Sequence, residues 1–481
     1  MRKFLSSAGL CIVLFVFVSC ATTKGIQTGA AKYGTIKYNQ KKFDAAFEKK
    51  NYSTCIAMLH DKNKDGKDIR DNLDEAMLCY MLNDYESSSE IFELTDSLMQ
   101  EAFTKSISKT MGATLFNDNI AEYPGNVYEY LFVNSFNALN YIHMGDLENA
   151  LVELNKAAVK ENEYLSKYGD FALADAVSSD EKSEMEKSAG KLGLNLSEYK
   201  ADSPKKPTMA DLYRDSAFLR YLSLVLYSAA GNRSSVEVDA KVLATLGSNI
   251  NVSEDVNIPA GKGRLDVLAL SGLIGRRHEA KFETPQVLPF YVPIDGAKPI
   301  LFKLKFVWPE YSGQDPQITD IEIELKDVGK KSAVVIEDFD EALAKDVRLK
   351  ANRAFNRSMI RSISKKTAGL ASAQATLISA RKIADEAKGS IAGVAAEATY
   401  VAAWHTAEYA VDQLDKTEFA DLRQGFYLPR SVSAAGFTVD PGTYSGKVTF
   451  YKDKTKVGEQ SFSNVTVSAN RPTLVVTSCF K

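Results

Sequence analysis

The segment that most constrains the fold of this chain is residues 134–157, NSFNALNYIHMGDLENALVELNKA. Two apolar runs with helical spacing flank a short polar turn that begins at Gly145, and small side chains recur where two helices would touch. Ala150, Leu154 and Ala157 form an i, i+4, i+7 stripe on the second run. This stretch therefore predicts an antiparallel helix pair.

Similar turns between apolar runs recur along residues 39–250. They lie at Asn51-Tyr52, Asn83-Asp84-Tyr85-Glu86, Gly145-Asp146-Leu147-Glu148 and Gly231-Asn232. The first two turns are about 33 residues apart, close to the period of about 34 in tetratricopeptide repeats. The spacing resembles that family of repeats, in which small residues let paired helices approach closely. We therefore expect a TPR-like helical repeat domain over residues 39–250.

The later intervals between these turns are longer than one repeat. They leave room for one degenerate unit near residues 98–122, and they require an insertion, which is visible as the charged segment 178–207. Its charges and two prolines predict that this segment lies outside the core. Cys55 and Cys79 fall on packing positions, so we expect them to act as small hydrophobic side chains and not in redox chemistry.

The N-terminus has the build of an export signal. Residues 1–19 combine a basic start with an apolar run of about a dozen residues, which favours a secretory signal over a spanning helix. The tetrad FVSC, which ends at Cys20, resembles a bacterial lipobox, with Phe where Leu is more usual. Cys20 would then be lipidated and followed by a flexible linker over residues 20–38. Ala21 favours the outer membrane, facing the periplasm; a plain secreted protein is the alternative.

Strand patterns appear twice in the second half of the chain. Alternating residues between Gly, Pro and Asp turns indicate a β-rich region over residues 251–337 and again over 417–481, with helices between them over 338–416. The economical topology joins the two strand-rich regions into one β-sandwich-like domain. The predicted fold class is α+β, with an N-terminal TPR-like helical repeat domain followed by a β-sandwich-like domain that contains an inserted Ala/Gly-rich helical segment.

Part of the inserted helical region is basic. Arg353, Arg357 and Arg361 recur at i+4 and form a basic stripe, while an apolar stripe lies on another face of the same predicted helix. Such a stripe could contact an anionic surface in a salt-sensitive way. The alternative is a solvated face of a helix that packs on its own domain.

The inserted region continues into an Ala/Gly-rich stretch, residues 369–411. Small residues on a helix surface allow close contacts and self-pairing. Glu397, His405 and Glu408 interrupt the last apolar run, so a buried or self-associating helix is favoured over a spanning one. If Gly389 or Gly393 lies at such a contact, replacing it with Leu should weaken the oligomer.

Little in the sequence points to catalysis, a metal or a cofactor. The net charge is −3, which argues against a nucleic-acid partner. The four histidines are scattered, and there is no HExxH, paired CxxC or nucleophile-elbow motif. Asp421 and Arg423 are the best polar pair, expected to form an orienting ion pair at a domain junction; an enzyme site near them, with His405, is the less favoured alternative. Tyr128 and Glu129 are expected to pack and cap a helix.

Several separated pieces also resemble one family. They are GNVYEYLFVNSFNALNYIHMGDLENALVELNKA, GRLDVLAL, MIRSISKK, the Ala-rich helices and ADLRQGFYLP, and together they cover most of residues 125–445. They resemble uncharacterised bacterial lipoproteins with tetratricopeptide-like repeats. In some proteobacteria such lipoproteins are encoded near activators of penicillin-binding proteins, which points toward cell-wall assembly. The resemblance implies a non-catalytic envelope scaffold or adaptor that binds other envelope proteins; a self-oligomerising envelope component is the alternative.

Overall fold

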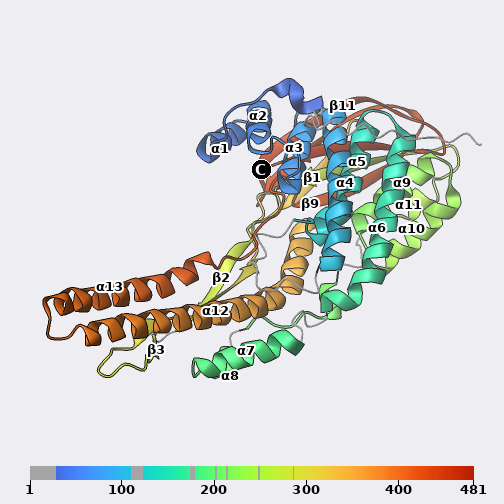
Figure 1. Ribbon diagram of the computed structural model, residues 1–481. Helices are drawn as coiled ribbons and strands as arrows, with labels where there is room; N and C mark the ends of the chain where they lie inside the picture. Colours follow the sequence, from blue (N-terminus) through green and yellow to red (C-terminus); the bar gives the residue numbers. More distant parts are fainter. Residues whose placement is uncertain are drawn as a thin grey trace, which may run out of the picture.

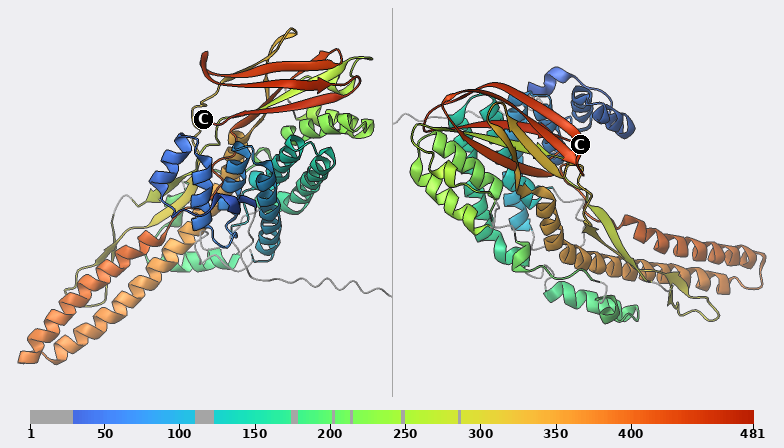
Figure 2. Two further views of the ribbon diagram at one scale, coloured as in Figure 1. Left: turned by 90° about the horizontal axis from the view of Figure 1, so that it is seen from above. Right: turned by 180° about the vertical axis from the view of Figure 1, so that it is seen from behind.

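The protein has a mixed α+β fold, with most helices in the N-terminal part and most strands in the C-terminal part (Figure 1). The structure is a computed structural model that describes residues 29–109, 123–173, 179–200, 203–212, 215–246, 250–284 and 287–481. Residues 20–28, which include Cys20 and the first part of the predicted N-terminal linker, therefore lie outside the described residues. A long helical hairpin extends from the body as an arm in all three views (Figures 1 and 2).

The N-terminal helices form consecutive pairs. Their bounds are α1 Gln40–Glu48, α2 Tyr52–Lys62, α3 Ile69–Met81, α4 Tyr85–Lys109, α5 Val127–His143, α6 Leu147–Leu173, α9 Ala217–Ala229 and α10 Arg233–Thr245. Short elements flank them: η1 Gly29–Tyr33, η3 Met209–Asp211 and α11 Ser253–Val256. All four turns predicted from the sequence separate two helices of one pair, so these four turns are confirmed.

The four turns share one geometry. In each, a residue with positive φ follows the helix end: Lys50 (φ 57), Asn83 (φ 61), Gly145 (φ 76) and Gly231 (φ 77). The next residue donates its backbone N–H five positions back, to Ala46, Cys79, Tyr141 and Tyr227, at 2.8 to 2.9 Å. This is the Schellman arrangement, which satisfies carbonyl groups that a helix end leaves without a partner. At three turns that same residue then caps the following helix, as Asn232 does by accepting from the backbone N–H of Ser235 at 3.2 Å.

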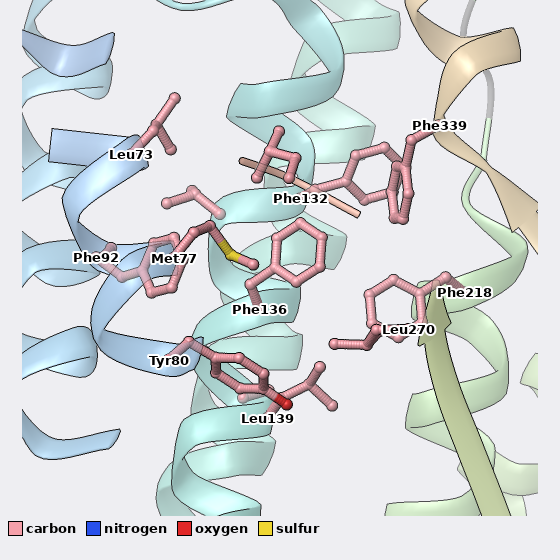
Figure 3. Packing of buried hydrophobic residues seen from close by; sticks show 14 of the residues in the cluster. Leu73, Met77, Tyr80, Phe92, Phe132, Phe136, Leu139, Phe218, Leu270 and Phe339 are labelled. Carbon is pink, nitrogen blue, oxygen red and sulfur yellow. The ribbon is translucent and has the colours of Figure 1, made fainter. Parts of the chain in front are cut away.

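The main core lies where helix α5 meets its neighbours. Phe132 and Phe136 of α5 lie between helices α3 and α4 on one side and Phe218 and Phe339 on the other (Figure 3). Ring centroids are 4.5 Å apart for Phe132 and Phe339, in an edge-to-face arrangement that aromatic pairs favour. The helix pairs are thus joined to the C-terminal half through aromatic packing.

Two predictions about the helical region need correction. The described part of the expected unit at 98–122 is a continuation of helix α4, and the rest lies outside the described residues. The charged segment 178–207 is not excluded from the core. It forms helices α7 Ser179–Lys191 and α8 Leu196–Lys200, which place Met185, Ala189 and Tyr199 in a buried cluster beside the arm. Met185 and Ala189 are four residues apart, so they share one helix face while the charged residues occupy the others.

Cys55 and Cys79 are fully buried, as predicted. Burial raises the pKa of Cys55 to about 12 and that of Cys79 well above its ordinary value. Thiols with such pKa values stay protonated and behave as small apolar side chains.

Eight strands form two four-stranded sheets. Their bounds are β1 Gly263–Ser271, β6 Asp320–Leu325, β7 Gly329–Ser332, β8 Val334–Asp338, β9 Ser431–Val439, β10 Gly442–Lys452, β11 Thr455–Val467 and β12 Pro472–Cys479. The strand orders are β12-β1-β9-β8 and β11-β10-β6-β7. Strand β1 is parallel to β12 and antiparallel to β9, and β6 pairs with β10. Strands from before and after residues 338–416 therefore share both sheets, as the predicted topology requires.

Strand β1 is buried on both faces. Leu265 and Val267 belong to an apolar cluster that also contains Ile323 of β6 and Phe450 of β10, so the two sheets share a core. Leu268 and Leu270 of β1 belong instead to the core that contains helices α5 and α9. Because side chains alternate across a strand, one sheet lies between the helices and the other sheet. The sheet β12-β1-β9-β8 thus covers one face of helices α5 and α9.

The remaining strands are separate from these sheets. Strand β2 His278–Glu283 pairs with β5 Lys305–Glu310, and β3 Leu288–Phe290 pairs with β4 Ile300–Phe302. The expectation that all strands of residues 251–337 join one sandwich-like domain is wrong for these four. Phe306 stacks on Phe282, and both Phe306 and Trp308 meet Phe355 of the arm edge-to-face. The apolar side chains of the β2-β5 ribbon are therefore buried against a helix.

The arm consists of helix α12 Phe339–Glu386, helix α13 Ile391–Gln413 and the short helix η4 Leu414–Thr417. Among the described helices, none combines the length and apolar character needed to cross a membrane. Within the described chain, Gly389 and Gly393 lie at the turn between α12 and α13, and their contact with another copy stays a prediction. Gly389 has φ +86 in the turn between α12 and α13, and a Cβ at Gly393 would overlap the carbonyl oxygen of Ala387. Both glycines shape this turn.

Candidate functional site

Residues 418–430, here called the linker, lead from the arm to strand β9 and lie against the helix pairs. The backbone N–H of Gly425 donates to Glu129 Oε1 of helix α5 at 2.6 Å. The backbone N–H groups of the next two residues donate to Asp74 Oδ1 of helix α3, at 2.6 and 3.3 Å. Two carboxyl groups from different helices thus hold three consecutive N–H groups of the linker, which gives the linker a fixed register on the helices.

Glu129 also caps its own helix. Its Oε2 accepts from the backbone N–H of Asn126 at 2.7 Å and from the hydroxyl group of Tyr123 at 2.5 Å. This is the capping role expected for Glu129, and Tyr128 beside it is buried as expected for a packing residue. Burial and the negative charge of Glu129 raise the pKa of Tyr123 well above its ordinary value, so its hydroxyl group stays protonated and donates.

Asp74 is buried on helix α3. Burial raises the pKa of Asp74 to about 8, even though the N–H groups of Phe426 and Tyr427 act in the opposite direction. A carboxyl group with this pKa is largely protonated at neutral pH. Asp74 can therefore accept from the linker without bringing an uncompensated charge into the core.

Asp421 and Arg423 form the ion pair predicted from the sequence. Arg423 Nε and Nη2 donate to the two carboxylate oxygens of Asp421 at 2.9 and 2.8 Å. Burial acts to raise the pKa of Asp421, but the bonds and charge of Arg423 outweigh it and lower that pKa. The Arg423 guanidinium lies 5.0 Å from the ring centroid of Tyr123. The backbone carbonyl oxygen of Arg423 accepts from Asn126 Nδ2 at 3.1 Å. The pair therefore packs against the N-terminal end of helix α5.

A second set of charges lies beside this pair and was not predicted. Arg277 donates to Asp346 Oδ2 at 2.5 Å, and both side chains are buried. Lys350 Nζ lies 2.9 Å from the same carboxylate and also donates to Asn126 Oδ1 at 2.9 Å. The backbone N–H of Val127 donates to Asp346 Oδ1 at 3.3 Å. Asp346 thus joins the start of helix α5 to the arm and to the segment before β2.

The predicted basic stripe on helix α12 is not an exposed face. Arg361 is 2% exposed and donates to Glu418 Oε2 at 3.2 Å, and Lys365 Nζ lies 2.5 Å from Glu418 Oε1. Arg353 and Arg357 are half-buried on the same helix. The expectation of a solvent-facing stripe for an anionic surface is therefore wrong at Arg361, because that side chain holds the first residue of the linker.

The structure brings four of the predicted residues together, namely Tyr128, Glu129, Asp421 and Arg423. His405, the third candidate for an enzyme site, lies on an exposed part of helix α13. A cavity of about 230 Å³ lies near Phe426 and is lined by Arg276 and Arg430, but not by any of these predicted residues. Within the described ranges, no group of three or more His, Cys, Asp or Glu side chains is arranged to hold a metal ion.

The interactions described above hold the backbone of the linker in a fixed position. Its donors and acceptors bond to one another across α3, α5, α12 and the segment before β2, so their chemistry fixes how these parts meet. No protein-family model, curated protein or solved structure matches this chain.

Proposed function

We propose that this protein is a non-catalytic lipoprotein scaffold of the cell envelope. Cys20 would carry the lipid anchor, most simply in the outer membrane, and TPR-like helix pairs would bind another envelope protein that acts in envelope or cell-wall assembly. The observation that carries the proposal is the recurrence of one turn geometry at four places, each between the helices of a pair. Repetition of one helical unit produces extended surfaces that suit protein binding.

The finer fold assignment is part of this proposal. Four helix pairs with the same turn support a TPR-like assignment for residues 39–250. Two four-stranded sheets that share an apolar cluster support a β-sandwich-like assignment for the strands of 251–337 and 417–481 that join them. The linker would hold these parts and the arm as one unit, which suits a scaffold whose task is to present a surface in a fixed orientation.

The binding surface would lie away from the sheet, because the sheet already occupies one face of α5 and α9. Helix α6 offers such a surface. Val152 is 45% and Val159 is 57% exposed, and they are seven residues apart, so they lie on one side of the helix two turns apart. Exposed apolar side chains that align on one helix face are suited to contact a partner.

Photo-crosslinking in living cells tests this surface. A photoreactive amino acid at Val152 or Val159 should give covalent adducts with a different envelope protein. The same probe at Thr466, an exposed residue of strand β11, should not give those adducts. Identical adducts from all three positions, or none from helix α6, would refute a scaffold that binds through this helix. Adducts of twice the chain mass alone would favour the self-oligomerising alternative.

The anchor is tested in the same cells. The wild-type chain should incorporate a fatty-acid analogue and sediment with membranes, whereas Cys20→Ala should lose the label and leave the membrane fraction. Retention of the label in Cys20→Ala would disprove lipidation at this residue. Because the crosslinking result depends on helix α6 and not on the anchor, the two parts of the proposal can fail separately.

A further inference from the structure

Helix α13 has the composition of a buried helix, yet most of it is exposed. Of its 23 residues, only Ala407 and Val411 are buried. Ile391 is 95% and Val394 is 75% exposed. A helix that is apolar on all sides normally has neighbours on all sides. Of the two alternatives expected for this stretch, burial within its own chain is wrong for helix α13, and self-association stays a prediction. The outer face of the helix lacks a cover among the described residues.

Two apolar stripes run along α13. One stripe, which includes Tyr400, Ala403, Ala407 and Val411, belongs to the cluster shared with helix α12. The other consists of Ile391, Val394, Ala398 and Val401, all of which are exposed. At about 100° per residue, the two stripes are centred roughly 150° apart, on opposite sides of the helix. The first stripe closes the hairpin, and the second faces outward.

The outer stripe has the spacing of a helix-bundle seam. Its members follow each other at intervals of three, four and three residues, which is the pattern by which helices pack knobs into holes. Between residues 391 and 407, Glu397 is the only Asp, Glu, Lys or Arg, and it lies 3.3 Å from Arg381 of helix α12. The outer stripe therefore carries no charge that would repel an identical stripe.

A membrane surface fits this stripe less well. Helices that lie on membranes usually carry an excess of Lys and Arg that attracts anionic lipids. Residues 381–408 contain three Lys and Arg residues against four Asp and Glu residues. The charge around the stripe thus gives no attraction to an anionic surface.

We infer that the occupant of the outer stripe is the same stripe of a second copy of this chain, so that two arms form an antiparallel four-helix bundle. A two-fold axis at Ala398 places this small residue against its counterpart, where the helices must approach most closely, and places Val394 near Val401 of the other copy. The stripe is therefore complementary to itself in size. This pairing is independent of the partner proposed for helix α6.

The available area fits a modest dimer interface. Helix α13 spans Ile391–Gln413, and an axis at Ala398 sets residues 391–405 of one copy against the same residues of the other, which corresponds to about 22 Å of helix beside a two-helix face about 20 Å wide. The product is roughly 450 Å² per copy, or ~900 Å² in total, which is in the range of the weaker specific complexes, below ~1,200 Å².

Light scattering of the full chain in a mild detergent, with the detergent mass subtracted, tests the dimer. The wild-type chain should have the mass of two copies. Ala398→Glu should have the mass of one, because two carboxylates would meet on the axis. The matched control is Thr399→Glu, an exposed neighbour one residue off the stripe, which should remain dimeric. Equal thermal unfolding of the two variants would show that both are folded.

A cysteine pair gives a second readout that does not depend on detergent. Without reductant, Ala398→Cys should form a disulfide between two chains in membranes, since the axis brings these residues together, whereas Thr399→Cys should form much less than Ala398→Cys. A wild-type monomer at every soluble concentration would overturn the inference. So would a dimer that survives Ala398→Glu, or one that Thr399→Glu disrupts equally.

Discussion

Asp346→Ala is expected to lower the free energy of unfolding by about 3–5 kcal/mol, because it leaves the Arg277 guanidinium buried without its carboxylate partner. Three groups depend on this carboxylate: Arg277, Lys350 and the backbone N–H of Val127 at the start of helix α5. Removal of the negative charge from the N-terminal end of helix α5 adds to this loss of stability, because a negative charge there is favourable. The measurement is urea unfolding of the variant and the wild-type chain at neutral pH.

The control for Asp346→Ala is Asp385→Ala. Asp385 also pairs with a guanidinium, that of Arg381 at 2.7 Å, but its side chain is half exposed. An exposed pair contributes little, so this variant should unfold close to the wild-type midpoint. If the two variants lose equal stability, Asp346 does not hold the junction as described.

The contribution of Asp346 should also depend on pH. Burial acts to raise its pKa, but the charges of Lys350 and Arg277 outweigh burial and hold the pKa below the ordinary value of 3.8. A carboxyl group with a lowered folded-state pKa contributes fully above its unfolded value and loses this contribution as the pH falls through its folded value. The difference between Asp346→Ala and the wild-type chain should therefore shrink below about pH 4.

Gly436→Ala is expected to cost about 3 kcal/mol or more of unfolding free energy, although it adds a single methyl group. Gly436 of strand β9 pairs with Asp266 of β1. A Cβ at this position would overlap Arg264 Nη2 and Asp266 Oδ1. Arg264 also bonds to Asp255 through two donors at 3.0 Å, so the methyl group would disturb a buried network with no room to relax.

A matched glycine offers the comparison for this strand. Gly442 begins the next strand, β10, and the atom nearest to an added Cβ there is 3.7 Å away, in the ring of Tyr444. Gly442→Ala should therefore change the urea midpoint little. Similar losses for Gly436→Ala and Gly442→Ala would mean that the Arg264 network does not require the space at Gly436.

The parts of the fold that local rules govern were predictable. The four helix turns follow from Asn, Asp and Gly at helix ends, because these residues adopt positive φ or cap helices without help from distant residues. The same holds for the Asp421–Arg423 pair, whose members are two positions apart, and for Glu129, which caps its own helix. Pairing of strands across the arm followed from the alternating pattern on both sides of residues 338–416.

The linker contacts could not be predicted, because their partners are remote in sequence. Gly425 and Glu129 are 296 positions apart, and Phe426 and Asp74 are 352 apart. Nothing in the residues around either partner signals the other. The same limit explains the wrong prediction at Arg361: the i+4 spacing on the helix is as predicted, but its partner, Glu418, is 57 positions away. The prediction for segment 178–207 is wrong because it rests on the charges of the segment and not on the i, i+4 spacing of Met185 and Ala189, which indicates a buried helix face.

We propose that the linker joins the helix pairs, the sheets and the arm into one rigid unit. Hydrogen exchange at the backbone N–H groups of Gly425, Phe426 and Tyr427 tests it most directly, since these groups donate to Asp74 and Glu129. We expect these groups to be protected as strongly as helix α5 in the native chain, because opening the linker would require opening the core. Rapid exchange at these three groups, while helix α5 stays protected, would contradict it.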